Sequence, residues 1–273
     1  MPNQIELITG ATDGIGQAVA KKLLTEGWRV VIVGRNPQRC AATVAELKTF
    51  GAISAITADL TSMRETNRAV ETFLRENQSL DFLMLNANAI VHEHIVTPEG
   101  FEANFALGYL SRALMMFKLE PILQATPNAH IMTVIGMNTA KVDFDDLTIA
   151  KNFSSGLALG RWQWATQVFA KQFNATRAVP MNVYMPGLVR TKILANEPQP
   201  MRLVVQIANL VMGIPVEKSA DNIFNVMNDV TQNKRKGAHY EWAKLKPAPA
   251  LEMNPDDPQK LWDVTQKLLV PYL

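Results

Sequence analysis

The sequence has one cysteine, Cys40, among its 273 residues. No disulfide can therefore form within the chain, and the composition is compatible with a reducing compartment. Four scattered histidines and this single cysteine offer no spacing suited to a metal site, so we predict none. An excess of charge is lacking as well, because the formal net charge is +2 and lysines and arginines do not gather in runs. This even distribution argues against nucleic acid as a partner.

Long hydrophobic runs are also absent. The longest weakly charged apolar stretch, residues 203–216, is interrupted by Gln206, Asn209 and Gly213 and is shorter than the ~20 residues that a membrane-spanning helix needs. We therefore predict no integral membrane segment, while peripheral membrane contact through this stretch stays open. No charged segment followed by an apolar one precedes residues 5–8, and we expect a cytoplasmic protein.

The chain does show short β-rich runs that alternate with longer helical patterns. We predict helices at residues 16–26, 37–50, 63–77, 98–123 and 155–176, and strands at residues 6–9, 29–33, 54–58, 82–85, 130–135 and 181–184. This alternation is typical of an α/β protein with a Rossmann-type, doubly wound parallel sheet in three layers. The length suits a single domain over residues 1–273. The pattern loosens after Gly187, and we expect a substrate lid at about residues 192–216.

Residues 9–16, with the sequence TGATDGIG, follow the first predicted strand directly. Gly10 permits a tight turn, and Gly14 lets the backbone approach a pyrophosphate. Gly16 opens a helix whose N-terminal amides can hold phosphates. A glycine pattern is weak alone, but strand, turn and helix occur here in the required order. The segment therefore predicts a dinucleotide-binding turn.

The second predicted strand ends in Gly34, Arg35 and Asn36, where a protein that prefers NAD often has an acidic residue for the ribose 2′-hydroxyl. Arg35 suits the 2′-phosphate of NADP instead, and a charge-assisted contact of this kind is worth about 1.5–3 kcal/mol. We therefore predict NADP(H) as the cofactor. The alternative is a surface arginine at the start of a helix.

Together these segments resemble the short-chain dehydrogenase/reductase family, and within it the retinol-dehydrogenase-like branch. The resemblance continues through 59–60 (DL), 85–88 (LNAN), 186–191 (PGLVRT), 237–240 (GAHY) and 261–262 (LW). It implies an oxidoreductase fold that forms homodimers or homotetramers through the helices around 98–123 and 155–176. It also implies cofactor contacts from Gly10, Thr12, Asp13, Gly14, Ile15, Gly16, Arg35, Asn36, Asp59, Leu60, Asn86, Ala87, Gln163, Pro186, Gly187, Val189 and Thr191. Asn88 stands where members have glycine, so its side chain either hydrogen-bonds the dinucleotide or obstructs it.

The catalytic positions of that family hold other residues here. In the family's register Gly108 stands for the relay asparagine, Gly136 for serine, Leu159 for tyrosine and Gln163 for lysine. The flanking segments 144–147 and 168–171 set this register without gaps, and no tyrosine lies between residues 109 and 184. Loss of a general acid-base group costs about 10²–10⁴ in rate. Positioning a hydride donor is a separate contribution that can reach ~7–11 kcal/mol.

Substitute proton donors are His92 and His94, which titrate near neutral pH, and Asn138 could offer an amide in place of serine. For each histidine the alternative is a loop side chain that faces solvent. Tyr109 and Lys192 are weaker candidates. The surroundings of the vacated site are predicted to be apolar because of Met137, Phe153, Leu157, Leu159, Trp162 and Trp164.

Two functions stay open. One is an NADP(H)-binding enzyme that acts on an apolar small molecule without the usual relay, by reducing an activated acceptor or by isomerisation or cyclisation. The other is a catalytically silent nucleotide-binding sensor or partner subunit. The enzyme predicts an enclosed apolar cavity above the nicotinamide, whereas the silent protein predicts a filled one. We favour the enzyme because the segment 186–191 is intact.

Overall fold

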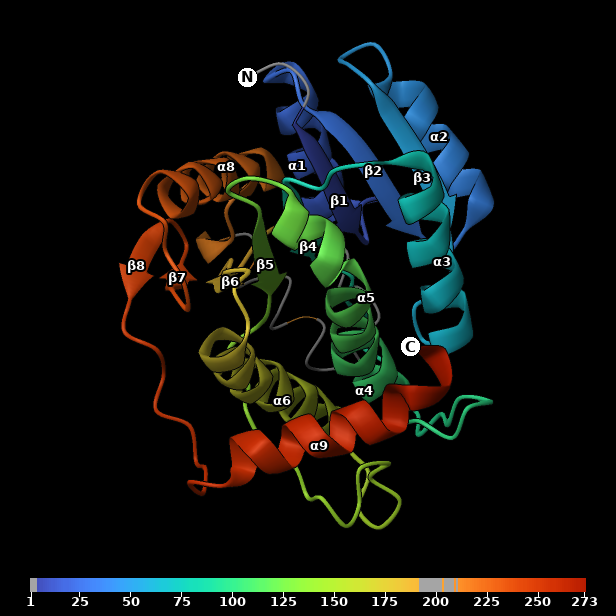
Figure 1. The fold of residues 1–273 in the computed structure, drawn as a ribbon, viewed down its shortest axis with the longest axis vertical. Helices are drawn as coiled ribbons and strands as arrows, with labels where there is room; N and C mark the ends of the chain where they lie inside the picture. Colours follow the sequence, from blue (N-terminus) through green and yellow to red (C-terminus); the bar gives the residue numbers. More distant parts are fainter. Residues whose placement is uncertain (1–3, 192–202, 204–208, 210) are drawn as a thin grey trace.

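The computed structural model describes residues 4–191, 203, 209 and 211–273. Its elements are, in chain order, β1 (Ile5–Thr9), α1 (Gly14–Thr25), β2 (Arg29–Gly34), α2 (Pro37–Leu47), β3 (Ile53–Thr57), α3 (Met63–Glu76), β4 (Phe82–Leu85), α4 (Ala103–Phe105), η1 (Ala106–Leu110), α5 (Ser111–Ala125), β5 (His130–Val134), α6 (Ser155–Thr176), β6 (Met181–Met185), α8 (Val216–Gln232), β7 (His239–Glu241), β8 (Lys244–Lys246), α9 (Asp257–Leu269) and η2 (Val270–Tyr272) (Figure 1).

A single sheet runs through the described part of the chain, with the strand order β3-β2-β1-β4-β5-β6-β7-β8. Every neighbouring pair from β3 to β7 is parallel, and β8 pairs antiparallel with β7. The predicted doubly wound sheet is therefore confirmed, with each predicted strand within one or two residues of its observed bounds. The order reverses between β1 and β4, and ligands bind at the carboxyl ends of strands at such a reversal.

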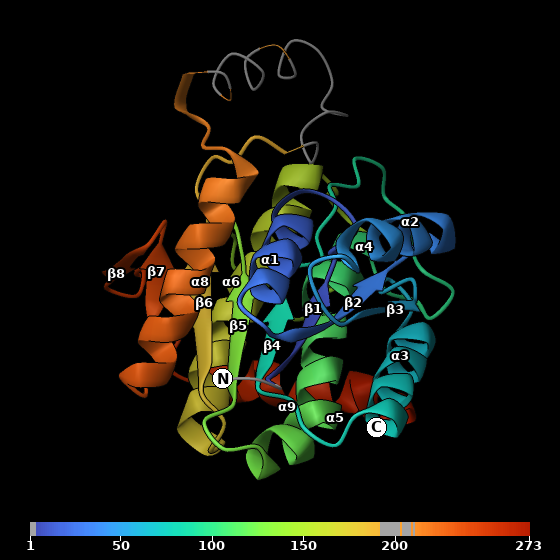
Figure 2. The ribbon, with the colours of Figure 1, turned by 90° about the horizontal axis from the view of Figure 1, so that it is seen from above.

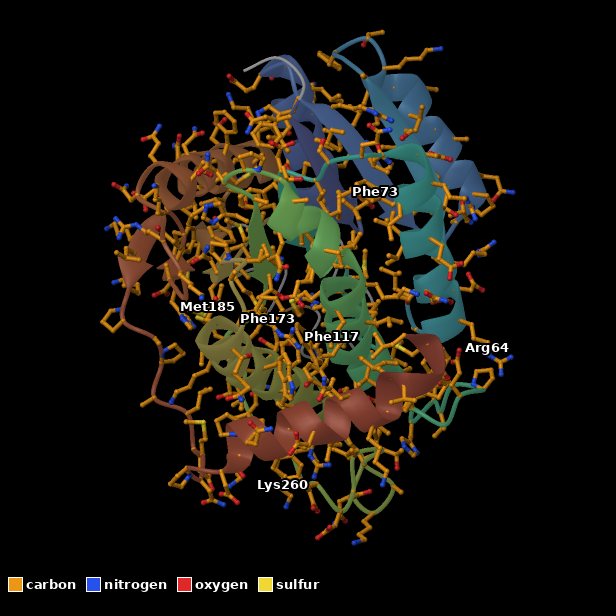
Figure 3. The ribbon with its side chains drawn as sticks, in the orientation of Figure 1. Arg64, Phe73, Phe117, Phe173, Met185 and Lys260 are labelled. Atoms are coloured by element: carbon orange, nitrogen blue, oxygen red, sulfur yellow. The ribbon has the colours of Figure 1, made fainter. Side chains whose placement is uncertain are left out.

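Helices cover both faces of this sheet and create two hydrophobic cores. One core lies against α1, α2 and α8, and the other against α3, α5, α6 and α9. Figure 2 shows α1 and α8 in front of the strands and α9 behind them. In Figure 3 the labelled Phe117 and Phe173 lie inside the second core, whereas Arg64 and Lys260 lie at its rim. Burial on both faces explains the almost continuous apolar runs of the strands.

The predicted helix at 98–123 is wrong in its first part, because regular helix begins only at Ala103. The buried Glu102 carboxylate accepts hydrogen bonds from the amides of Asn104 and Phe105 and so caps the helix there. A π-helical turn, η1, then spans Ala106–Leu110 and includes Gly108. Single π turns inside helices frequently occur at functional sites.

The C-terminal helix α9 runs across α5 and α6 (Figure 1). Its Trp262 ring stacks on Phe169 at a centroid distance of 5.0 Å and meets Phe117 edge-on at 5.1 Å. The predicted pairing of copies through these two helices stays a prediction, and α9 limits the surface available for it.

Two further elements, α8 and the edge strand β8, were not predicted from sequence. Of the predicted lid at residues 192–216, only residues 203, 209 and 211–216 lie within the described part, so the lid stays a prediction. None of the helices that the structure describes has both the length and the apolar character to cross a membrane.

Candidate functional site

Two adjoining hollows form one groove at the carboxyl ends of the central strands. The first, of about 200 Å³, lies beside β2 and the segment 58–61, and the second, of about 490 Å³, lies between α1 and the segment 186–191. Both hollows share the lining residues Gly10, Thr12, Arg39, Asn88 and Ala89. The groove therefore occupies the place that the strand order favours for a ligand.

The turn after β1 is held against the end of β4. Gly10 has φ +67°, and a Cβ there would lie 2.6 Å from the Cα of Ala87, so only glycine allows this approach. The Asn86 side-chain amide donates to the carbonyls of Thr9 and Gly10, each at 3.1 Å. Asn86 lines the second hollow and also fixes the turn that forms its floor.

The N-terminus of α1 opens into the second hollow. Gly14 has φ +58°, and its amide donates to the Asp13 carboxylate at 2.7 Å. The Arg39 guanidinium lies 3.9 Å from the same carboxylate, with both side chains exposed. Amides and the helix dipole favour an anion at this end of α1, and Arg39 offsets the negative charge of Asp13.

The segment 186–191 forms the opposite wall. Gly187 has φ +67°, and a Cβ there would lie 2.5 Å from the Trp242 indole. Val189 forms a parallel bridge with Ile214. A Cβ on Gly14 would lie 3.3 Å from Thr191 Cγ2, so this wall closely approaches the glycine turn.

The first hollow has a different chemistry. The Asp59 carboxylate accepts from the amide and the hydroxyl of Thr61, at 2.9 and 2.8 Å, and thereby shapes this wall. Asn36 caps α2 by accepting from the amide of Arg39 at 2.9 Å. Arg35 and Arg39 are both exposed at this wall, so two guanidinium groups border the same hollow.

Of the predicted cofactor residues, all but Gly16 and Gln163 line the groove. Gly16 is buried within the turn, where a Cβ would lie 2.7 Å from Asn86 Nδ2. Asn88 is exposed and lines both hollows. Sequence reasoning missed Arg39, although its position one helical turn after Arg35 was a usable signal.

At the first relay position, Gly108 leaves room for an indole. A Cβ on Gly108 would lie 2.6 Å from Trp162 Cγ, so an asparagine side chain does not fit beside this ring. Trp162 is fully buried. No feature of the local sequence indicates this contact, because residues 108 and 162 lie on different helices.

At the other relay positions, Gln163 and Leu159 are turned into the protein. Gln163 is 4% exposed, and a Cβ on Gly136 would lie 2.9 Å from its Oε1. Leu159 is partly buried against the core of α5, α6 and α9. The four positions predicted for the relay therefore carry no group that titrates or donates a hydroxyl proton.

Sequence reasoning also missed Arg112, which lies one turn after Gly108. Its guanidinium is buried and donates to Thr133 Oγ1 at 2.6 Å, to the Val134 carbonyl at 2.7 Å and to the Ala87 carbonyl at 2.9 Å. It also lies over the Trp162 ring at 4.9 Å. Burial lowers the pKa of Arg112 to about 9. Arg112 thus joins the ends of β4 and β5 beneath the groove.

The substitute donors predicted from sequence do not line the groove. His92 Nδ1 lies 3.3 Å from Ser155 Oγ, and His94 Nε2 lies 2.8 Å from the Thr148 carbonyl. The Asn138 amide donates to the Gly156 carbonyl at 2.8 Å. These contacts join the segments after β4 and β5 to each other and to the start of α6, and the role of the three side chains as donors stays a prediction.

Tyr109, a weaker candidate, lies in the core. Its hydroxyl is 2.5 Å from Thr265 Oγ1 on α9, and burial raises its pKa far above the ordinary value. Lys192, the other weaker candidate, lies outside the described residues. Neither residue offers a described proton donor at the groove.

The apolar residues predicted around the vacated relay site lie there in part, because Trp162 packs against Gly108 and Leu159 is partly buried against the same core. None of the six predicted residues lines the groove, whose apolar wall comes from Ile90, Val134, Ile135, Leu188 and Val189. Met137 is 73% exposed, and the Trp164 indole donates to the Glu252 carbonyl at 2.8 Å. Among the described residues, no group of three or more His, Cys, Asp or Glu side chains could hold a metal ion.

Comparison with known proteins gives the family. A model described as short chain dehydrogenase matches residues 4–202. Retinol dehydrogenase 14 of Homo sapiens is 25% identical over 98% of this chain and 87% of its own. The chain therefore belongs to the short-chain dehydrogenase/reductase family, in its retinol-dehydrogenase-like branch, and shares a family with known dehydrogenases.

Solved structures support the same fold. An alcohol dehydrogenase from Thermococcus sibiricus complexed with 5-hydroxy-NADP has a TM-score of 0.68 and 16% identity, and the match covers 92% of this chain and 100% of that one. A short chain dehydrogenase/reductase from Burkholderia phymatum in complex with NAD has a TM-score of 0.67 and 18% identity, with 88% and 89% of the two chains covered. Proteins of this fold thus bind nicotinamide dinucleotides of both kinds.

Proposed function

We propose that this protein binds NADP(H) in the groove and transfers a hydride between it and an apolar small molecule without a Ser-Tyr-Lys relay. The observation that carries the proposal is an open groove of two hollows beside predicted relay positions that hold Gly108, Gly136, Leu159 and Gln163. The Trp162 indole takes the volume beside Gly108. The proposal includes a substrate lid formed by residues 192–216.

The residues of the groove fit a dinucleotide. The N-terminus of α1, with Thr12 and Ile15 at the second hollow, offers the environment that a pyrophosphate requires. Leu60 and Asp59 line the first hollow and would contact an adenine there, and the segment 186–191 lines the second hollow and would contact the nicotinamide. The exposed Arg35 and Arg39 would bind a 2′-phosphate, and this pair supports NADP(H) over NAD(H).

The chain's own contribution is then to bind and orient. The cofactor, when bound, supplies or accepts the hydride. Gly10, Gly14 and Asn86 hold the turn under it, and Arg112 keeps the ends of β4 and β5 in register. Because no relay position can deliver a proton, the acceptor must already be activated, as an iminium ion is, or must take its proton from water.

One observation favours a second candidate, a catalytically silent nucleotide-binding protein. The Trp162 indole fills the volume beside Gly108. A protein that senses the ratio of reduced to oxidised cofactor would need the groove and no relay.

A titration and a turnover assay test the proposal together. By calorimetry we expect NADPH to bind at least about tenfold more tightly than NADH, and Arg35→Ala to remove that preference through loss of a charged contact. Lys48→Ala, at the end of α2 and outside the groove, is the matched control and leaves both affinities unchanged. Equal binding of NADH and NADPH by the unmodified protein would contradict the assignment of Arg35.

For turnover we expect oxidation of bound NADPH by a protonated cyclic imine but not by an aldehyde of similar size. Ala89→Trp, which narrows both hollows, serves as the control that abolishes the reaction. Tight NADPH binding with no oxidation by either acceptor would favour the silent protein. Failure to bind NADPH at all would contradict both functions.

A further inference from the structure

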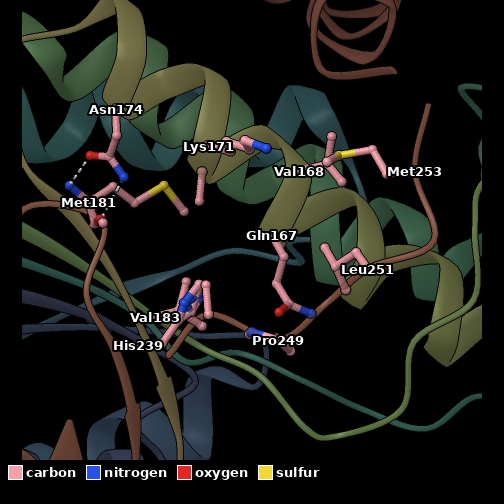
Figure 4. A pocket seen from close by; sticks show the side chains of 13 residues that line it. Gln167, Val168, Lys171, Asn174, Met181, Val183, His239, Pro249, Leu251 and Met253 are labelled. Atoms are coloured by element: carbon pink, nitrogen blue, oxygen red, sulfur yellow. Dashed lines mark hydrogen bonds between the residues drawn. The ribbon is translucent and has the colours of Figure 1, made fainter. Parts of the chain in front are cut away.

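A second pocket lies on the α6 side of the sheet, away from the groove. It is a cavity of about 300 Å³ between the C-terminal half of α6, strands β6 and β7, and the segment 248–253 that leads to α9 (Figure 4). None of the residues that line it lines either hollow of the groove. A volume of this size is at the lower end of the range of about 300–1,000 Å³ for small-molecule sites.

The wall of this pocket is mostly apolar. Val168 of α6, Met181 and Val183 of β6, and Leu251 and Met253 of the covering segment form most of it. The polar side chain of Asn174 is paired with β6 (Figure 4). Its Nδ2 donates to the Met181 carbonyl at 2.8 Å, and its Oδ1 accepts from the Met181 amide at 3.0 Å. Asn174 therefore stabilises the contact between α6 and β6, and a ligand in the pocket would have to bind other polar groups.

Two further polar side chains at this wall are buried and incompletely paired. Gln167 is 5% exposed and His239 is 9% exposed. Gln167 Nε2 donates to the Gln163 carbonyl at 3.3 Å, but its Oε1 has no hydrogen-bond partner in the described part of the structure. Both ring nitrogens of His239 lack a partner there as well. In Figure 4 the Gln167 amide and the His239 ring lie in the same half of the view, across from Lys171 and Met253.

Unpaired polar atoms of this kind are costly, since a shielded donor or acceptor without a partner loses its hydrogen bonds to water and gains none in exchange. Burial lowers the pKa of His239, so its ring is neutral and offers one N–H donor and one acceptor nitrogen. Gln167 offers an acceptor oxygen. A single hydroxyl group can donate to Gln167 Oε1 and accept from the His239 N–H at the same time.

We propose that this second pocket is a binding site for a small, largely apolar molecule that carries one hydroxyl group, which is held between Gln167 and His239. The apolar body of the ligand contacts Val168, Met181 and Leu251. The exposed segment around Ala248 forms the outer wall. The site is independent of the proposed nucleotide groove, so failure of either proposal leaves the other standing.

The test uses 2-naphthol as the probe and naphthalene as its analogue without the hydroxyl. For the full chain we expect 2-naphthol to bind about five- to tenfold more tightly than naphthalene, a net difference typical of one or two hydrogen bonds. Gln167→Leu lowers this preference because it removes one of the two hydrogen bonds while keeping the volume of the side chain. Gln172→Leu, on the same helix but outside the pocket, is the matched control and keeps it.

Two variants locate the binding. Ala248→Trp, at an exposed position of the outer wall, fills the pocket and abolishes 2-naphthol binding without disturbing the core. Ala89→Trp, in the nucleotide groove, leaves 2-naphthol affinity unchanged. The proposal is overturned if both probes bind equally, if neither binds, or if Ala89→Trp rather than Ala248→Trp abolishes binding. A structure at saturating 2-naphthol with only ordered water between Gln167 and His239 overturns it too.

Discussion

At the scale of single residues, the substitutions at the relay positions depend on their neighbours. Trp162 takes the volume beside Gly108, and the Gln163 amide lies against Gly136. A serine placed at 136 alone would force the Gln163 side chain to move, since even a Cβ there would lie 2.9 Å from Oε1. In a close-packed interior, the effects of substitutions at neighbouring positions depend on one another. The relay therefore has to be restored as a set.

We predict that combining Gly136→Ser, Leu159→Tyr and Gln163→Lys raises NADPH-dependent reduction of a simple aldehyde at least about tenfold. This increase would be part of the factor of about 10²–10⁴ in rate that a general acid-base group contributes. The decrease in NADPH absorbance measures the rate. The same background with Leu159→Phe has the ring without the hydroxyl and should stay at the unmodified rate. An unmodified protein that already reduces the aldehyde as fast as the triple variant would show that the relay positions are misassigned.

At the scale of an element, β1 is a buried central strand that contains a carboxylate. Glu6 is fully buried, and neither carboxylate oxygen has a hydrogen-bond partner in the described residues. Burial raises the pKa of Glu6 well above its ordinary value of 4.5. A carboxyl group with a raised pKa in the folded state binds its proton more tightly there than in the unfolded chain. The stability therefore decreases as pH rises above 4.5, until Glu6 ionises in the folded state.

We predict that Glu6→Gln stabilises the protein by about 1–3 kcal/mol at mildly alkaline pH, where the parent must either keep a proton or bury a charge. At about pH 4 the difference should disappear, because Glu6 is neutral in both folded and unfolded chains. Urea unfolding across this pH range measures it. Glu93→Gln, at an exposed loop position, is the control and should change the stability little at any pH. A Glu6→Gln effect that is the same at both pH values would mean that the pKa of Glu6 is equal in the folded and unfolded chains, and would contradict the raised pKa.

At the scale of the whole molecule, α9 joins the end of the chain to its middle. Trp262 lies among Phe117, Phe169 and Phe173, and the Arg177 guanidinium lies over its ring at 5.3 Å. The chain thus covers with its own C-terminal helix a face that it would otherwise have to bury against another molecule. Exposed apolar surfaces of this kind are typical of association sites.

We predict that Trp262→Ala lowers the free energy of unfolding by about 3–5 kcal/mol, the usual cost of removing a large buried aromatic ring. Truncation after Asn254 should in addition increase self-association in sedimentation experiments, because the face of α5 and α6 becomes exposed. Lys267→Ala, on the same helix but outside the core, is the matched control for stability. If the truncated and intact chains sediment alike and have the same stability, α9 does not cover an apolar surface that promotes association.

Much of the fold and half of the candidate site were predictable from sequence. The segment 9–16, the strand runs and the helix start at Pro37 are local patterns, and the structure shows each of them where it was expected. The positions of Arg35 and Asp59 at the first hollow followed from their places at strand ends. The helix start at Ala103 did not, because the capping by Glu102 was not recognised in the sequence.

The sequence by itself therefore determined the order of strands and helices and the glycine turn, because periodicity and turn residues act over a few neighbouring positions. The absence of the relay side chains stays a prediction from the sequence. Only the tertiary structure decided that Trp162 fills the space at Gly108 and that Arg112 joins β4 to β5. It also decided that α9 covers α5 and α6. The same holds for the three predicted donors that lie outside the groove, His92, His94 and Asn138. These contacts join residues far apart along the chain. They depend on how side-chain volumes fit together after the elements have packed, which no local pattern encodes.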